Sequence, residues 1–150
     1  MSETKEARAY KRLKECVCRP NDRMERVENG VATGMPDVNY CIMGIEGWIE
    51  IKFPDEPARP TTALFGNGNH QVSVDQCNWL LKQSQAGGRG WLFIATTERL
   101  IMIEGARVGK MGTLINKMTT HELEQIARWR VDLPIMDQLR WADLRQLLAS

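Results

Sequence analysis

Two acidic side chains and one lysine form a pattern that could do hydrolytic chemistry. Asp37 follows Pro36 after a glycine-containing turn, and an apolar run further on carries Glu50 and Lys52. Side chains two apart in a strand point to the same face of a sheet, so Glu50 and Lys52 should lie side by side. Two carboxylates can hold a divalent cation, while an ammonium group can stabilise developing negative charge. Residues 34–52 therefore predict a metal-dependent site for phosphodiester cleavage.

Magnesium favours oxygen ligands and keeps several waters, so two carboxylates and one backbone carbonyl would suffice. Asp37 and Glu50 are the natural ligands, and the carbonyl of Ile51 is a third candidate. Lys52 could orient the attacking water or stabilise negative charge. Each residue alone has a simpler interpretation: Asp37 as a turn residue, and Glu50 with Lys52 as the solvated face of an edge strand.

Composition and charge distribution fit one globular domain that binds a polyanion. The 150 residues are 43% hydrophobic and 26% charged, with a formal net charge of +1. Cations crowd the amino end, whereas acids gather in residues 46–56. A basic flank beside an acidic centre is typical of a protein that grips nucleic acid and holds a metal against it, although a solvated helix face explains any single charge run. The candidate DNA contacts are Arg8, Lys11, Arg12, Arg19, Arg23 and Arg26, followed by Arg59, Lys110 and Lys117.

Several other classes of site and location are disfavoured. The four cysteines lack zinc-ligand spacing, which argues against structural zinc. No Gly-Lys-Ser/Thr closes the glycine-rich loop, so we expect no nucleotide cofactor. With neither a signal peptide nor a transmembrane run, we expect no membrane contact and a cytoplasmic location, in the host cytoplasm if the gene is phage-borne.

Periodicity and turn residues predict an α/β fold in the order α-β-β-β-α-β-β with a mixed sheet. Ser73 and Gln76 form a capping box that opens the second helix, and Gly87-Gly88 ends it. The first helix should occupy residues 2–17 with Ser2 as its N-cap. The predicted strands are residues 24–27, 38–43, 48–53, 90–96 and 100–103, with a long irregular loop at 54–71.

After Gly105 the pattern changes to a glycine-punctuated link, which reaches Gly112, and then to helices. Thr119 and Glu122 form a second capping box, and leucines in residues 139–148 suggest a terminal helix. We therefore predict a nuclease core in residues 1–105 and a helical extension in residues 106–150 that packs on the same domain.

Pro36-Asp37 followed by Glu50-Ile51-Lys52 resembles the motif of the PD-(D/E)XK nuclease superfamily. The likeness covers roughly residues 3–103. Within that superfamily, the chain is most similar to VRR-NUC-type and phage Holliday-junction-resolvase-like nucleases, because Gly-x-Pro-Asp, Glu-x-Lys and Ser-x-x-Gln all have counterparts here. The resemblance implies a restriction-endonuclease-like αβββαβ core, dependence on Mg²⁺ or Mn²⁺, hydrolysis of DNA and a homodimer.

Carried over residue by residue, the resemblance makes Asp37 and Glu50 metal ligands and Lys52 the catalytic lysine. Gln76 would lie near the site, although the capping box explains it equally well. Many members place a glutamate on the first helix, where Glu6 is the best-placed candidate, ahead of Glu3 and Glu15.

Two further residues complete the candidate site. Glu28, just before the Gly-x-Pro-Asp turn, could be a further ligand or a DNA contact. His70 could contact phosphate or transfer a proton, or it could be an incidental loop residue.

No base-reading module is recognisable, so we expect recognition of DNA structure, such as a branch, a flap or a Holliday junction. Two alternatives remain open. One is a catalytically silent nucleic-acid-binding protein with the same fold, which would be expected to lack an acid or the lysine. The other is a restriction-type nuclease, for which only the terminal helices could supply a target-recognition region.

Overall fold

Six strands form one mixed sheet in the order β1-β2-β3-β4-β5-β6. The structure is a computed structural model that describes residues 3–27, 32–66 and 70–150. Strands β3 and β4 are parallel, and every other neighbouring pair is antiparallel. The predicted α/β class with a mixed sheet is therefore confirmed. The strands are β1 (Arg23–Arg26), β2 (Val38–Ile42), β3 (Ile45–Lys52), β4 (Arg89–Ala95), β5 (Arg99–Glu104) and β6 (Trp129–Asp132).

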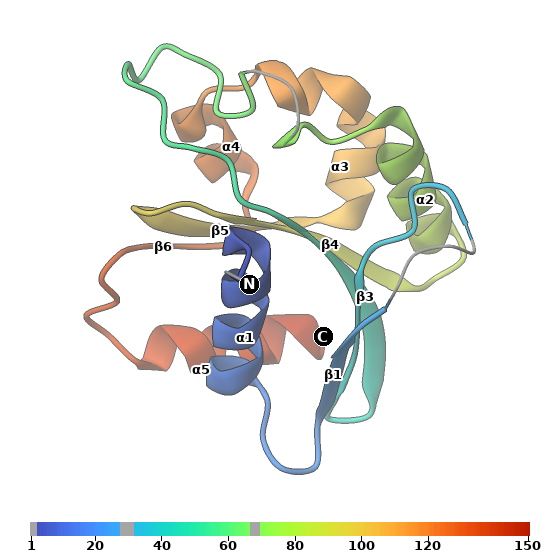
Figure 1. The fold of residues 1–150 in the computed structure, drawn as a ribbon. Coiled ribbons are helices and arrows are strands. Elements are labelled where there is room, and N and C mark those ends of the chain that lie inside the picture. The colour runs from blue at the N-terminus through green and yellow to red at the C-terminus, as the bar shows by residue number, and fades with distance from the viewer. Residues whose placement is uncertain (1–2, 28–31, 67–69) are drawn as a thin grey trace.

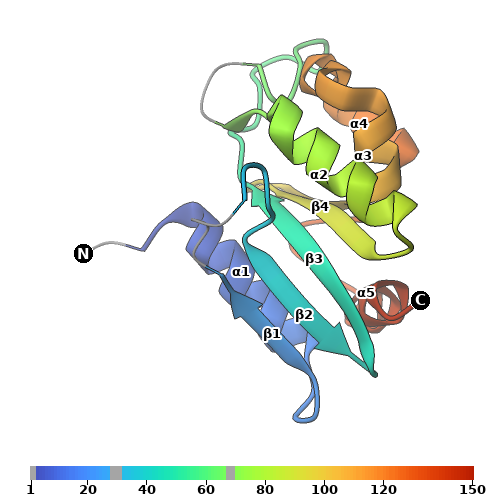
Figure 2. The same cartoon turned by 90° about the vertical axis from the view of Figure 1, so that its right-hand side faces the viewer.

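Helices cover both faces of the sheet, which gives three layers (Figures 1 and 2). One face carries α1 (Lys5–Val17) and α5 (Leu139–Leu148), and the other carries α2 (Val74–Gln85), α3 (Gly105–Met111) and α4 (Thr120–Ile126). Successive strand residues alternate between the two apolar clusters, as in β4, where Phe93 packs under α1 and α5 while Leu92 packs under α2. The sheet is thus buried on both sides and can position side chains rigidly.

Helix α1 begins at a local cap and places one apolar stripe on the sheet. The hydroxyl of Thr4 accepts a hydrogen bond from the amide of Ala7, so Thr4 is the N-cap of α1. The predicted cap, Ser2, lies outside the described residues. Ala9, Leu13 and Val17 recur at intervals of four and are buried.

The β2–β3 hairpin turns at Met43 and Gly44, whose φ angles of 52° and 80° both lie in the left-handed region. This two-residue turn pairs Ile42 with Ile45 and fixes the register of the whole hairpin. The sequence placed the connection later, across residues 44–47, so β3 begins three residues earlier than predicted.

The carboxyl-terminal third contains more than the predicted helices. Residues 105–111, within the predicted link, form α3, and a 3₁₀ helix (Gly112–Lys117) follows it. The capping box of Thr119 and Glu122 is present at the start of α4. Strand β6, which the sequence did not predict, pairs with β5 before α5 crosses the opposite face. Among the described residues, no helix is long and apolar enough to span a membrane.

Candidate active site

Asp37 lies near Glu50 at one end of the hairpin. Val38, the first residue of β2, pairs with Ile49 of β3, so Asp37 directly precedes the strand at the end where Glu50 lies. The charge of Asp37 acts on Glu50, which places the two carboxyl groups close together. Glu50 and Lys52 share strand parity, and Glu50 accepts a hydrogen bond from Gln76 of α2, so both side chains lie on the face turned toward α2.

Glu50 is a buried carboxyl group in a crowded acidic environment. Its residue is only 6% exposed. Burial raises the pKa of Glu50 to about 8, the nearby charges of Asp37 and Glu6 raise it too, and Lys52 and the hydrogen bond from Gln76 oppose the rise. An excess of buried negative charge of this kind favours a proton or a cation at the site.

Gln76 performs both of the roles that the sequence left open. Its Oε1 accepts a hydrogen bond from the amide of Ser73 in the capping box of α2, at 2.9 Å. Its Nε2 donates to Oε1 of Glu50, also at 2.9 Å. Because the cap fixes the Gln76 side chain, the bond to Glu50 fixes the orientation of the buried carboxyl group.

Gly34 brings the turn before Asp37 against the start of α2. Its φ angle is 81°, which an L side chain rarely adopts. A Cβ atom at this position would also collide with the backbone of Asp75 and Gln76. Glycine therefore allows the close approach between the Asp37 segment and the helix that carries Gln76.

The two oxygens of the Asp37 carboxylate have different surroundings. Oδ2 lies 3.3 Å from the guanidinium of Arg26, which also lies over the ring of Tyr10, 5.9 Å from its centroid. Oδ1 is buried and has no hydrogen-bond partner among the described residues. A buried carboxylate oxygen without a partner is costly, so Oδ1 is suited to a ligand.

These residues fit a hard divalent cation. Unpaired Oδ1 of Asp37 and the buried carboxyl group of Glu50 are oxygen donors of the kind that Mg²⁺ prefers. The described residues contain no group of three or more His, Cys, Asp or Glu side chains that could hold a metal, so backbone and water oxygens would have to complete the shell. Ile51 pairs with Phe93 of β4, and a ligand role for the Ile51 carbonyl stays a prediction.

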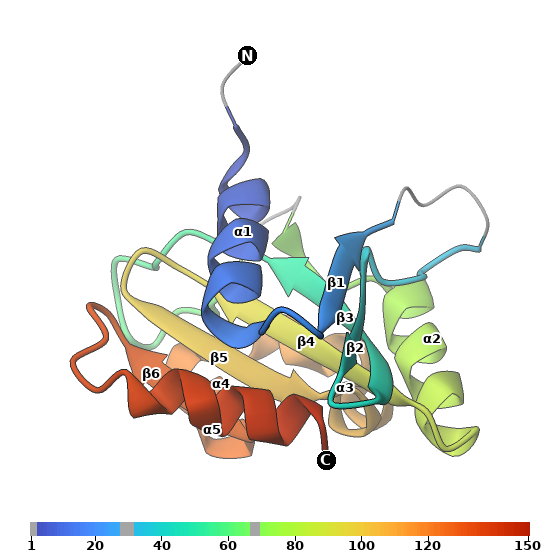
Figure 3. The ribbon, with the colours of Figure 1, turned by 90° about the horizontal axis from the view of Figure 1, so that it is seen from below.

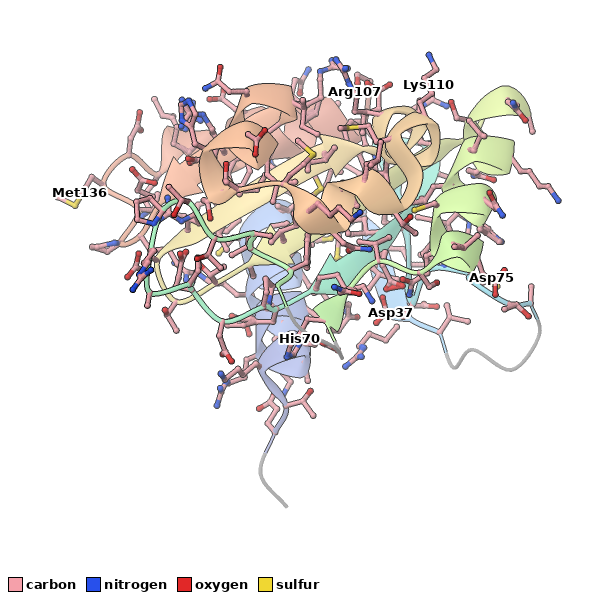
Figure 4. The ribbon with its side chains drawn as sticks, turned by 90° about the horizontal axis from the view of Figure 1, so that it is seen from above. Asp37, His70, Asp75, Arg107, Lys110 and Met136 are labelled. Atoms are coloured by element: carbon pink, nitrogen blue, oxygen red, sulfur yellow. The ribbon has the colours of Figure 1, made fainter. Side chains whose placement is uncertain are left out.

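The first helix approaches the site through Glu6. The charge of Glu6 raises the pKa of Glu50, and its Oε1 lies 4.0 Å from Nδ1 of His70. Nδ1 of His70 is buried and makes no hydrogen bond within the described ranges. Figure 4 shows His70, Asp37 and Asp75 along the same edge of the molecule. His70, which had no partner in the sequence analysis, thus has an acidic neighbour beside the site.

The other predicted site residues are distributed differently. Glu28 lies outside the described residues. Glu3 and Glu15 are exposed, and Glu3 pairs with Lys11. Of the predicted DNA contacts, Arg26 reaches Asp37, and Arg23 donates a hydrogen bond to Asn39 in the neighbouring strand. The structure places Arg8 and Arg12 against an apolar cavity on the opposite face of the sheet.

The sequence predicted Arg26 as a DNA contact and did not predict its ion pair with Asp37. The ion pair forms because β1 and β2 pair Arg26 with Val38, the residue after Asp37, and β1 is too short for the sequence to fix that register. The approach of Glu6 to His70 was also missed, because it depends on the path of a long loop.

Comparison with solved structures finds similarity at low sequence identity. No family model matches the chain, and no curated protein sequence matches it. The chain is similar to the structure of Hjc from Archaeoglobus fulgidus, a Holliday junction resolvase from an archaeal hyperthermophile, with 17% sequence identity and a TM-score of 0.44. The match covers 65% of this chain and 73% of that one.

Proposed function

We propose that the protein is a metal-dependent endonuclease that hydrolyses DNA phosphodiester bonds and selects branched, flapped or Holliday-junction DNA by its structure. The proposal rests on the proximity of Asp37, Glu50 and Lys52, whose charges act on one another at the end of the hairpin, and on the hydrogen bond from Gln76 to Glu50. Asp37 and Glu50 would hold Mg²⁺ or Mn²⁺. A bound divalent cation neutralises charge on the scissile phosphate and lowers the pKa of a water molecule.

The chain's own groups have separate tasks in this reaction. Gln76 keeps the Glu50 carboxylate in one orientation through its hydrogen bond of 2.9 Å. As the water oxygen bonds to phosphorus and the P–O bond to the leaving group breaks, the ammonium group of Lys52 stabilises the negative charge on the phosphate. The attacking water gives up a proton to the solvent, and the leaving oxygen takes one up, so the hydrolysis balances.

Substrate binding would use cations near the site before cleavage begins. The side chain of Arg26 is 40% exposed beside Asp37, so it can contact a DNA phosphate without leaving this edge of the molecule. Contacts of this kind supply affinity without reading base sequence. Structure selection would then come from the arrangement of two such centres in a homodimer, one for each strand of a junction.

The test is cleavage of labelled linear duplex, single-stranded, flapped and four-way DNA in Mg²⁺ and in EDTA. Wild type should cut branched DNA only with Mg²⁺, and Asp37→Asn should lose cleavage. Asp75→Asn is a matched control, because Asp75 is an exposed carboxylate at the start of α2, next to the same turn. Equal nicking of every substrate by wild type and Asp37→Asn would overturn the proposed centre. Cutting of linear duplex at one fixed sequence would overturn structure selection alone.

Lys52→Met separates binding from chemistry. This variant should bind Mn²⁺ and four-way DNA but cut at least about a hundredfold more slowly, since loss of one charge-stabilising group costs roughly 10²–10³ in rate.

Sedimentation velocity with and without four-way DNA tests the homodimer, and a monomer in both conditions would contradict it.

A further inference from the structure

An apolar cavity lies between α1, α5 and the sheet, on the face opposite Glu50. Its volume is about 270 Å³, and it is open to solvent. Figure 3 shows α1 and α5 crossing this face. Most of the lining is apolar and comes from several elements that are distant in sequence, through Leu13, Phe53, Phe93, Leu100, Leu133 and Trp141. A space of this size and lining can accept one large apolar side chain.

Two arginines on one face of α1 also line this cavity. Arg8 and Arg12 are one turn apart, and the guanidinium of Arg12 lies 5.8 Å from the centroid of the Trp141 ring. Neither side chain makes an ion pair in the parts of the chain that the structure describes, whereas Lys5 and Lys11 on the same helix pair with acids. The cavity therefore joins an apolar interior to two available positive charges.

One of the two threonine hydroxyls in the wall is already occupied. The hydroxyl of Thr96 donates to Glu56 and accepts from the amides of Glu98 and Arg99. A nucleobase inserted into the apolar interior would lose its hydrogen bonds to water and could not replace them at Thr96, which is unfavourable. An aliphatic or aromatic side chain carries no such cost.

The chain segment that borders the cavity adds exposed apolar surface. Leu133 and Trp141 both line the cavity, and the segment between them carries Met136 and Leu139, which are 89% and 70% exposed. Figure 4 shows Met136 at the outer end of the molecule, far from Asp37. Exposed apolar residues beside an apolar cavity are typical of an interaction surface.

We propose that this cavity is a docking site for an acidic peptide segment of a partner protein. One large apolar side chain of the peptide fills the space under α1 and α5, and neighbouring carboxylates pair with Arg8 and Arg12. Charge complementarity selects an acidic partner, and the occupied hydroxyl of Thr96 disfavours a base. The site is separate from the proposed nuclease centre, so either can fail without the other.

The probe is a fluorescein-labelled peptide of five aspartates followed by phenylalanine, measured by anisotropy and by the NMR shift of the Trp141 indole N–H. Wild type should bind saturably and shift that signal. Replacing the peptide's phenylalanine by alanine, or using Arg8→Gln with Arg12→Gln, should weaken binding at least about tenfold. Lys11→Gln with Lys14→Gln is the matched control and should bind as wild type does, because neither lysine lines the cavity.

Thr97→Trp tests the cavity without changing its charge. Thr97 is an exposed lining residue, so a large side chain there blocks the mouth while the core stays intact. This variant should also bind the peptide at least about tenfold more weakly. Absence of saturable binding, equal binding of the alanine peptide, or a Trp141 shift with oligothymidylate but not with the peptide would overturn the proposal.

Discussion

Replacing Glu50 by glutamine should remove a pH-dependent loss of folding stability. The folded protein holds Glu50 with a pKa of about 8, against an ordinary value of 4.5. Between these values the unfolded chain binds fewer protons than the folded one, so the free energy of unfolding falls as pH rises. The stability that the raised pKa of Glu50 adds to the folded protein is complete below about pH 4.5, and it is lost as pH rises toward 8.

The size of this effect follows from the two pKa values. A rise from 4.5 to about 8 corresponds to a total loss of about 5 kcal/mol, since each pKa unit is worth about 1.4 kcal/mol. Between pH 5 and pH 7 the loss should be about 2–3 kcal/mol by the same linkage relation. Glu50 is 6% exposed, so solvent screening reduces this figure little. The new glutamine side chain in E50Q would keep an oxygen acceptor for Nε2 of Gln76.

Urea unfolding in EDTA at pH 5, 6 and 7 measures the effect. The difference in free energy of unfolding between E50Q and wild type should grow in favour of E50Q by about 2–3 kcal/mol from pH 5 to pH 7. Saturating Mg²⁺ should restore part of the lost wild-type stability at pH 7, because ligand binding to the folded state stabilises it. Parallel pH profiles for the two proteins would refute the raised pKa.

Three substitutions test the framework around the site, each by urea unfolding. Gln76→Ala should lower the free energy of unfolding by about 1–2 kcal/mol, because it removes both a helix-capping bond and the bond to Glu50; an unchanged midpoint would contradict this. Tyr40→Phe should cost about 1–3 kcal/mol, because it leaves the indole of Trp91 and a carbonyl of α5 without their partner; a neutral effect would show that water replaces the hydroxyl. Gly47→Ala should cost about 1–3 kcal/mol, because its Cβ would collide with the buried Tyr40 ring; wild-type stability would show that the ring can move.

The order of helices and strands from α1 to β5 was predictable from the sequence, because the hydrophobic patterns of these elements are strong. Alternation around Glu50 and the unbroken apolar run at residues 90–96 leave few other interpretations. Strand β6 was missed because it is four residues long, lies at the sheet edge and alternates buried with exposed positions immediately after a helix. Its strand character depends on pairing with β5 and less on local preference.

In the site too, contacts that follow from local sequence were predictable, and contacts that depend on long-range pairing were not. The Pro-Asp and Glu-x-Lys motifs predicted that Asp37 and Glu50 would come together, although the predicted connection at residues 44–47 implied a different register, and the capping box fixed the position of Gln76 on α2. The contact of Arg26 with Asp37 depends on a strand register, so sequence reasoning did not find it. The separation of Arg8 and Arg12 from the acidic centre depends on which face of the sheet α1 covers, and charge counting carries no such information.

The most direct test of the proposed centre is Mn²⁺ binding, followed by electron paramagnetic resonance of the free ion. Wild type, Asp37→Asn and Asp75→Asn are compared at pH 8. Wild type and Asp75→Asn should bind Mn²⁺ at the same site with the same affinity, whereas Asp37→Asn should lose that site. If Asp37→Asn binds Mn²⁺ as wild type does, Asp37 and Glu50 do not form a metal centre, and the proposed hydrolytic mechanism fails with it.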